Sequence, residues 1–108
     1  MEEKMLEIAG KAYELTYSLK RIEMIEAATG KPLMAELKGN GGFLSISTLK
    51  MYFAYALKCQ DDNNYVKIKE GIELAEKLIE DETAGYVSLN VMVLEALQRD
   101  CPFFFQAD

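Results

Sequence analysis

Apolar and polar residues alternate over residues 5–17, and the alternation is interrupted once, at Gly10. The apolar positions on the two sides of this glycine are Leu6, Ile8, Tyr13, Leu15 and Tyr17. Alternation around a glycine turn is typical of a half-buried β-hairpin. A helix through the same residues would carry Gly10 in its interior, at a cost of about 1 kcal/mol. The pattern therefore predicts an N-terminal hairpin over about residues 5–17.

The next segment has the start and stop signals of one helix, over about residues 18–29. Ser18 is a natural N-cap because its hydroxyl can accept a hydrogen bond from a first-turn N–H. An apolar stripe with a three-residue spacing follows, made by Leu19, Ile22, Ile25 and Ala28. Gly30 can adopt the left-handed conformation that closes a helix, and Pro32 prevents its continuation. Residues 33–46 are predicted to be a loop, most mobile over the glycine-rich residues 38–43.

Two further helices are indicated, over about residues 48–59 and 64–82. The first has Ser47 as a candidate cap and apolar residues at helical spacing, namely Leu49, Tyr52, Phe53, Ala56 and Leu57. It is apolar on nearly all sides, so we expect it to be the central, most buried element. The second has candidate caps at Asp61, Asp62 or Asn63, and its apolar seam consists of Tyr65, Ile68, Ile72, Ala75 and Ile79. Gly85 is expected to end it.

The last predicted helix spans about residues 88–100, with Ser88 as its candidate cap. Residues 89–97 are also compatible with a buried strand, but the cap and the segment's length favour a helix. Pro102 is expected to stop it and to leave residues 102–108 as an aromatic tail. The sequence thus predicts one α+β domain over residues 1–108, mostly helical, with an N-terminal β-hairpin followed by about four helices.

Charge and composition restrict the function classes. The net charge is −6, from 18 acidic and 12 basic residues, and no basic stripe is present, so nucleic acid is not an expected partner. No apolar run approaches the ~20 residues that a membrane span needs. The acidic start, Met1-Glu2-Glu3-Lys4, lacks the layout of a secretion signal, and we expect a cytoplasmic protein.

Residues with catalytic or metal-binding chemistry are scarce. The chain has no histidine, the commonest general base and metal ligand. Residues 61–64 are acidic or amide residues but lack the spacing of a calcium loop. Glu23 and Glu26 are interpreted as exposed surface, and a metal-dependent enzyme using them is a minor alternative. Cys59 and Cys101 are expected to be reduced structural residues. We therefore expect no enzyme activity, no catalytic residues, no cofactor and no metal.

Apolar surface offers a better candidate for function. Phenylalanines at a chain end either fold back over the helices or form an exposed patch that docks on a partner. The outward face of the last helix is the second candidate. The predicted partner-binding residues are Tyr86, Leu89, Val93, Leu97, Phe103, Phe104 and Phe105.

Two motifs, one in the predicted hairpin and one at the end of the first predicted helix, resemble motifs of the tail assembly chaperones of long-tailed bacteriophages and prophages, especially those of Gram-positive hosts. The first is Gly10-Lys11-Ala12-Tyr13-Glu14-Leu15-Thr16-Tyr17, in the hairpin. The second is Ile25-Glu26-Ala27-Ala28-Thr29-Gly30-Lys31-Pro32-Leu33, at the end of the first helix. The family pattern is a GKxYxLxY-like hairpin and a helix ending in IExATGKxL. The resemblance extends over about residues 5–100.

The resemblance implies a non-enzymatic chaperone that binds the tape measure protein and assists assembly of the tail tube. Such a protein acts in the cytoplasm of the host cell, is absent from the mature virion, and has the tail tube protein as a possible further partner. These chaperones are often made in two lengths by frameshifting, and this chain would correspond to the short form. Self-association is also possible. The alternative function is a small cytosolic adaptor or regulator, of phage or bacterial origin, that binds another protein.

Overall fold

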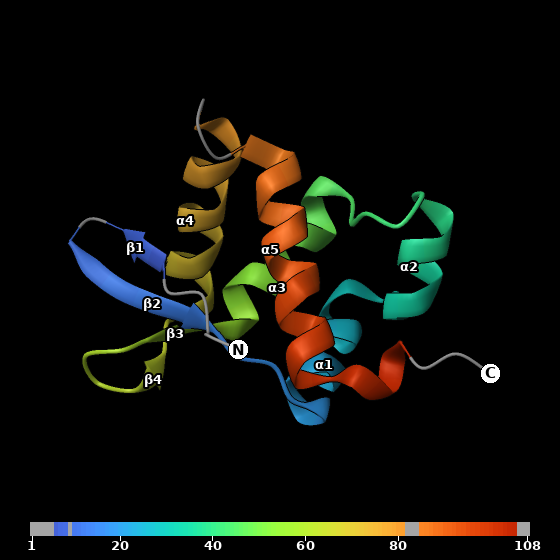
Figure 1. Ribbon diagram of the computed structural model, residues 1–108, viewed down its shortest axis with the longest axis horizontal. Coiled ribbons are helices and arrows are strands. Elements are labelled where there is room, and N and C mark those ends of the chain that lie inside the picture. Colours follow the sequence, from blue (N-terminus) through green and yellow to red (C-terminus); the bar gives the residue numbers. More distant parts are fainter. Residues whose placement is uncertain (1–5, 9, 82–84, 106–108) are drawn as a thin grey trace.

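The computed structural model of the protein describes residues 6–8, 10–81 and 85–105. It is an α+β fold, mostly helical, in which a small sheet lies beside a group of helices (Figure 1). In chain order the elements are β1 (Leu6–Ile8), β2 (Lys11–Leu15), α1 (Leu19–Thr29), α2 (Leu33–Gly39), α3 (Ile46–Ala56), β3 (Leu57–Cys59), β4 (Asn64–Tyr65), α4 (Ile68–Glu80), α5 (Gly85–Asp100) and a 3₁₀ helix, η1 (Pro102–Phe104). The predicted fold class is thereby confirmed.

The predicted hairpin is confirmed, and it is half of a larger sheet. The strand order is β1-β2-β3-β4 and every neighbouring pair is antiparallel. Gly10, with a φ of 81°, lies in the turn between β1 and β2. The alternation was interpreted correctly, since Tyr13, Leu15 and Tyr17 are all buried. Met5, at the start of the predicted hairpin, lies outside the described residues.

The predicted helix over residues 48–59 is wrong at its end, because residues 57–59 form strand β3. Leu57 pairs with Leu15 and Cys59 with Tyr13 of β2. The Ala56 carbonyl accepts from the Thr16 N–H at 2.9 Å, so the chain enters the sheet as soon as α3 ends. A continued helix and a strand paired with β2 would both satisfy the backbone groups of residues 57–59. The strand is favoured because it also covers the edge of β2, which would otherwise be open.

The predicted helix over residues 64–82 is wrong at its start. Residues 61–63 belong to the turn of the β3–β4 hairpin, in which Asn63 has a φ of 58°. The N-cap of α4 is Lys67, without a side-chain hydrogen bond, so none of the predicted caps is used. Tyr65 lies in β4, where the Arg21 guanidinium covers its ring with 3.7 Å between Cζ and the ring centroid. In α4 the fully buried positions are Gly71 and Ala75.

α1 begins and ends as predicted. The Ser18 hydroxyl accepts from the Arg21 N–H at 3.2 Å, and Gly30 ends the helix with a φ of 73°. Within the predicted stripe, Ile22 and Ile25 are buried, whereas Leu19 is exposed.

The loop predicted over residues 33–46 is wrong in its first half, because residues 33–39 form α2. Pro32 follows the Gly30 cap of α1 and supplies the extended N-cap conformation of α2. The Glu26 carboxylate accepts from the Leu33 N–H at 2.7 Å, so one helix caps the next. This contact also corrects the interpretation of Glu26 as simple exposed surface.

α3 is the central helix, as predicted, although it begins at Ile46 and has Ser45 rather than Ser47 as its N-cap. It packs most extensively against α4 and also contacts α1 and α5. Its buried residues are Thr48, Leu49, Tyr52, Phe53, Ala54 and Ala56.

α5 is a helix, which resolves the strand-or-helix ambiguity, and it begins at Gly85 rather than at residue 88. Gly85 therefore does not end the preceding helix, which stops at Glu80. After α5 the chain turns at Cys101 into the 3₁₀ helix η1, so the start of the predicted tail is structured. Residues 106–108 of that tail lie outside the described residues.

Candidate functional site

Three of the predicted partner-binding residues lie in the core. Leu89, Val93 and Leu97 are at most 1% exposed, on the side of α5 that faces the other helices. Their four-residue spacing marks the buried stripe of a helix, and the sequence reading assigned it to the wrong side. A partner that binds the folded domain must therefore contact other side chains.

Tyr86, the fourth predicted residue on α5, is half-buried and holds a neighbouring loop. Its hydroxyl donates to the Leu44 carbonyl, and its ring meets the Phe43 ring edge-on with centroids 6.3 Å apart. These contacts occupy the polar end of the side chain. Tyr86 therefore fixes the loop before α3 and is not a free docking residue.

Of the three tail phenylalanines, two fold back over the helices and one is exposed. Phe104 and Phe105 are half-buried and pack against the core cluster. Phe103 is 50% exposed, with its ring 5.0 Å from that of Phe104 between centroids. Only Phe103 of the three offers a largely exposed apolar side chain.

The exposed side of α5 carries two valines that the sequence analysis did not select. Val87 is 57% and Val91 is 41% exposed, and their four-residue spacing stacks them on one face of the helix. The signal for them was present in the sequence, because once residues 89, 93 and 97 are assigned inward, positions 87 and 91 must point outward. We call Val87 and Val91 the valine strip.

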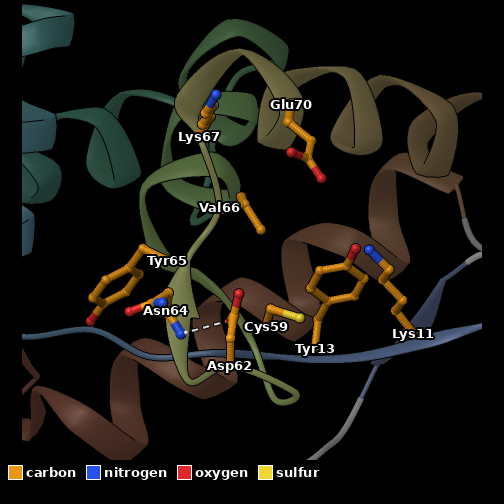
Figure 2. A pocket seen from close by; sticks show the side chains of 9 residues that line it. All are labelled: Lys11, Tyr13, Cys59, Asp62, Asn64, Tyr65, Val66, Lys67 and Glu70. Atoms are coloured by element: carbon orange, nitrogen blue, oxygen red, sulfur yellow. Dashed lines mark hydrogen bonds between the residues drawn. The ribbon is translucent and has the colours of Figure 1, made fainter.

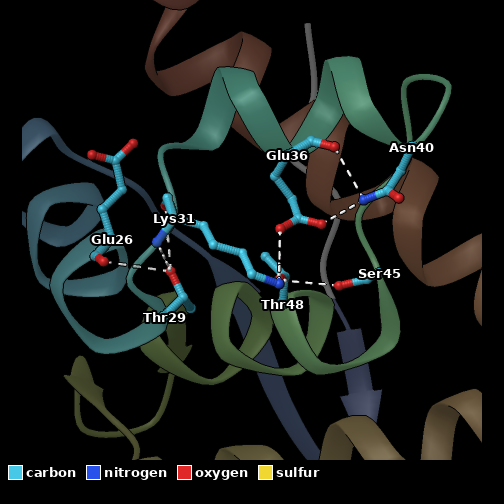
Figure 3. A network of polar contacts seen from close by, with 7 residues as sticks. All are labelled: Glu26, Thr29, Lys31, Glu36, Asn40, Ser45 and Thr48. Carbon is cyan, nitrogen blue, oxygen red and sulfur yellow. Dashed lines mark hydrogen bonds and ion pairs between the residues drawn. The ribbon is translucent and has the colours of Figure 1, made fainter.

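A polar cluster lies around Glu36 of α2 (Figure 3). Glu36 is only 8% exposed, and its carboxylate accepts hydrogen bonds from Thr48 Oγ1 of α3 at 3.2 Å and from Asn40 Nδ2. Lys31 Nζ lies 3.6 Å from Glu36 Oε1, and Ser45 donates to Thr48. A buried carboxylate needs such partners, since an unpaired one costs several kcal/mol.

These contacts set the protonation of Glu36. Burial alone would raise the pKa of this carboxyl, but the Lys31 ammonium and the hydrogen bonds from Thr48, Asn40 and Ser45 outweigh burial and hold the pKa below its usual 4.5. Glu36 is therefore ionised near neutral pH. An ionised carboxylate engaged in this way holds α2 onto α3 and has no proton to donate.

A second buried polar residue, Asn90 of α5, fastens the segment just after the glycines. Its Oδ1 accepts from the Leu44 N–H at 2.8 Å, and its Nδ2 donates to the Leu44 carbonyl at 3.3 Å. Asn90 is fully buried, and these two bonds satisfy the backbone of a residue that belongs to no helix or strand. The sequence offered a signal in the single amide among the apolar residues of 89–97.

A shallow hollow of about 230 Å³ lies between the sheet and the start of α4 (Figure 2). Its lining is mostly polar and consists of Lys11, Tyr13, Cys59, Asp62, Asn64, Tyr65, Val66, Lys67 and Glu70. Within it the Asp62 carboxylate accepts from the Asn64 N–H at 3.1 Å, which stabilises the β3–β4 turn. The Cys59 thiol is half-buried in this hollow, whereas Cys101 is fully buried elsewhere.

The described residues contain neither a metal-binding cluster nor a membrane-spanning helix. Among them no group of three or more histidine, cysteine, aspartate or glutamate side chains could hold a metal ion. In that part of the chain no helix combines the length and the apolar character needed to cross a membrane. Of the predicted acidic pair, Glu23 is exposed and Glu26 is half-buried as the cap of α2.

Comparisons with protein-family models, with curated proteins and with solved structures gave no match for this chain. The structure defines a small α+β domain, and its exposed apolar side chains on α5 and at Phe103 form the candidate site.

Proposed function

We propose that this protein is a non-enzymatic tail assembly chaperone of a long-tailed phage or prophage. It binds the tape measure protein in the cytoplasm of the host cell, assists assembly of the tail tube, and is not retained in the virion. The proposal rests on the resemblance of two motifs and on the valine strip of α5, which is the observation that carries the binding step.

The valine strip suits a helical client. Val87 and Val91 form a narrow apolar surface on a helix whose other side is fixed in the core by Leu89 and Val93. A rigid helix that presents a narrow apolar strip can pack along the apolar face of an amphipathic helix. A long, largely helical tape measure protein would present such faces repeatedly.

The motif at the end of α1 gives a second line of support. In the structure Glu26 binds the backbone of Leu33, Gly30 takes the left-handed conformation, and Lys31 pairs with Glu36. These residues build the corner between α1 and α2, so each has a specific structural role. The motif that resembles the chaperone family therefore consists of residues with structural roles in this fold.

Co-expression with the tape measure protein of the same genome tests the proposal. We expect the wild-type chain to keep a tape measure fragment soluble and to co-purify with it. Val87→Ser with Val91→Ser should reduce the captured fragment about tenfold, because about half of each valine would leave water on binding and full burial of a valine contributes about 1.5–3 kcal/mol. The double substitution should leave the fold intact, since both side chains are exposed.

A matched control uses the exposed apolar residues of α1. Leu19 and Met24 are 59% and 39% exposed, so Leu19→Ser with Met24→Ser removes a similar apolar area at another place. Capture of the fragment should survive this change. Equal loss in both double variants would reject the valine strip, and no capture by the wild type would favour an adaptor or regulator of another protein.

The phenylalanine tail needs a narrower test. Replacing Phe103, Phe104 and Phe105 together would also remove core packing, because the last two contact the core cluster. Phe103→Ser alone removes the one largely exposed ring. Reduced capture with an unchanged melting temperature would add Phe103 to the binding surface, and unchanged capture would remove the tail from it.

A further inference from the structure

α2 and the residues that follow it form a flap, residues 33–45, at one side of the helical group. In Figure 1, α2 lies apart from α4 and α5, at the edge of the molecule. Residues in the left-handed conformation lie before and within the flap: Gly30 has a φ of 73°, Gly41 of 67° and Gly42 of 94°. Glycine is the residue that changes backbone conformation most freely. The chain can therefore rotate at Gly30, just before the flap, and at Gly41 and Gly42, between α2 and Leu44.

The inner face of the flap is apolar. Leu33 and Leu37 stand one helical turn apart on α2, and Leu44 follows the glycines; all three belong to the core cluster. Leu33 and Leu44 are fully buried and Leu37 is 7% exposed. α2 is thus a short amphipathic helix that covers part of the core with two leucines.

The flap is fastened to three helices by polar contacts. Glu36 accepts from Thr48 of α3, the Leu33 N–H donates to Glu26 of α1, and the Leu44 backbone pairs with Asn90 of α5. When the flap opens, water can replace each of these partners, and Glu36 regains its hydration. Hydrogen bonds of this kind contribute little net stability compared with apolar packing, but they fix one geometry.

We propose that the flap is a displaceable lid, and that α2 occupies within the molecule a groove formed by α1 and α3 that accepts an amphipathic helix of a partner. The chemistry of that partner is given by α2 itself: Leu33-Met34-Ala35-Glu36-Leu37 has two leucines one turn apart and a carboxylate beside the second. A client helix with the same Leu-x-x-Glu-Leu pattern can make the same contacts with Thr48 and Lys31. The lid rests on the geometry alone, whereas its use by a client rests on the proposed function.

Native-state hydrogen exchange tests the lid without any client. The amides of Leu33 and Leu44 bond to Glu26 and Asn90, which lie outside the flap, and they therefore report on its closure. We expect these amides to exchange by local opening, with rates that depend little on low denaturant, while amides of α3 and α5 exchange only through global unfolding. Equal protection and equal denaturant dependence in the flap and in α3 would overturn the lid.

Thr48→Val provides a variant that keeps every leucine of the flap. It removes the hydroxyl that donates to Glu36, so exchange of the flap amides should rise about tenfold, as for one lost hydrogen bond to a charged group. Exchange within α5 should rise far less. A uniform increase over all helices would mean that Thr48 stabilises the whole fold, and the lid would be rejected.

A labelled peptide tests the groove. The probe is a fluorescent peptide of residues 30–42, and its control carries serine in place of both leucines. Binding should be at least about tenfold tighter to the Glu36→Ala protein than to wild type, since this substitution weakens closure of the resident helix but leaves Thr48 and Lys31 available to the peptide. Equal or absent binding would overturn the exchange of helices. Because this outcome concerns only α2 and its groove, it is independent of whether the tape measure protein is the client.

Discussion

Gly71 of α4 lies directly against the backbone of Ala54 of α3. A Cβ placed on Gly71 would stand 2.7 Å from the Ala54 Cα and 2.9 Å from its Cβ. Backbone atoms cannot move aside as a flexible side chain can, so the two helices would have to separate. The small residues at this crossing explain how α3 and α4 come to share the largest helix–helix contact of the fold.

Gly71→Ala should therefore destabilise the protein. Although alanine is the better helix former by about 1 kcal/mol, the overpacking costs about 1–3 kcal/mol or more and determines the sign. We expect the free energy of unfolding, measured in urea, to fall. Gly39→Ala is the matched control, because Gly39 also lies in a helix and nothing lies within 4 Å of the added Cβ. A Gly71→Ala protein as stable as the control would contradict the close approach.

Two buried tyrosines should respond differently to the loss of their hydroxyls. The Tyr17 hydroxyl donates to the Tyr52 carbonyl at 2.8 Å, whereas the Tyr52 hydroxyl is buried without a hydrogen-bond partner among the described residues. Tyr17→Phe should cost about 1 kcal/mol, the usual contribution of one hydrogen bond. Tyr52→Phe should be neutral or stabilising, because it removes a polar group that is desolvated without compensation. The melting temperatures of the two variants test this difference. A larger fall in melting temperature for Tyr52→Phe than for Tyr17→Phe would show that the Tyr52 hydroxyl has a partner.

Acid should weaken the fold through Glu36 and Asp100. Burial opposes ionisation of Asp100, but hydrogen bonds from Arg99 and from the Tyr17 N–H hold its pKa below the usual 3.8, as the partners of Glu36 do for that carboxyl. A carboxyl whose pKa is lower in the folded state stabilises the fold above its unfolded pKa. This stabilisation is lost as the pH falls through the folded pKa.

We therefore expect the free energy of unfolding to decline below about pH 4.5, the usual range of these carboxyls. Glu36→Gln should be less stable than wild type at pH 7 and should show a shallower decline in acid. Glu7→Gln, which changes an exposed carboxylate of β1, is the control and should leave the profile unchanged. An unaltered acid profile in Glu36→Gln would show that Glu36 does not contribute to it.

The two cysteines should differ in reactivity toward thiol reagents. Cys59 is half-buried, whereas Cys101 is fully buried, and burial together with the nearby Asp100 carboxylate raises the pKa of the Cys101 thiol. Since the thiolate is the reactive form, Cys101 should be modified only when the fold opens. Titration with a chromogenic disulfide should give one faster thiol per chain, absent in Cys59→Ser. Two equally fast thiols in the native protein would contradict this assignment.

Elements with strong local signals could be predicted from the sequence. The turn at Gly10, the cap at Ser18 and the left-handed end at Gly30 depend on residues next to them in the chain. The apolar spacing from Leu49 to Phe53 likewise marked the central helix. The structure has each of these features where it was expected.

Elements that depend on distant partners could not be predicted in this way. Residues 57–59 continue a helical pattern, and they form a strand because β2, more than forty residues earlier, offers its edge. α2 has seven residues and no side-chain bond from its own N-cap, and its cap comes instead from Glu26 of another helix. The site residues on α5 were mispredicted for a similar reason. Periodicity locates an apolar stripe on this helix but does not show whether the stripe faces the other helices or the solvent.

Asp100 and Tyr17 are separated by 83 positions in the chain, yet the Asp100 carboxylate accepts from the Tyr17 N–H at 2.8 Å. Arg99 also donates to the Leu15 carbonyl. A ribosome adds about 5–20 residues per second, so Tyr17 is synthesised about 4–17 seconds before Asp100. During that interval the Tyr17 N–H and the Leu15 carbonyl lack these partners. Synthesis of α5 is thus the event that fastens the end of the hairpin, and slow codons placed before α5 would lengthen the interval in which the hairpin lacks these bonds.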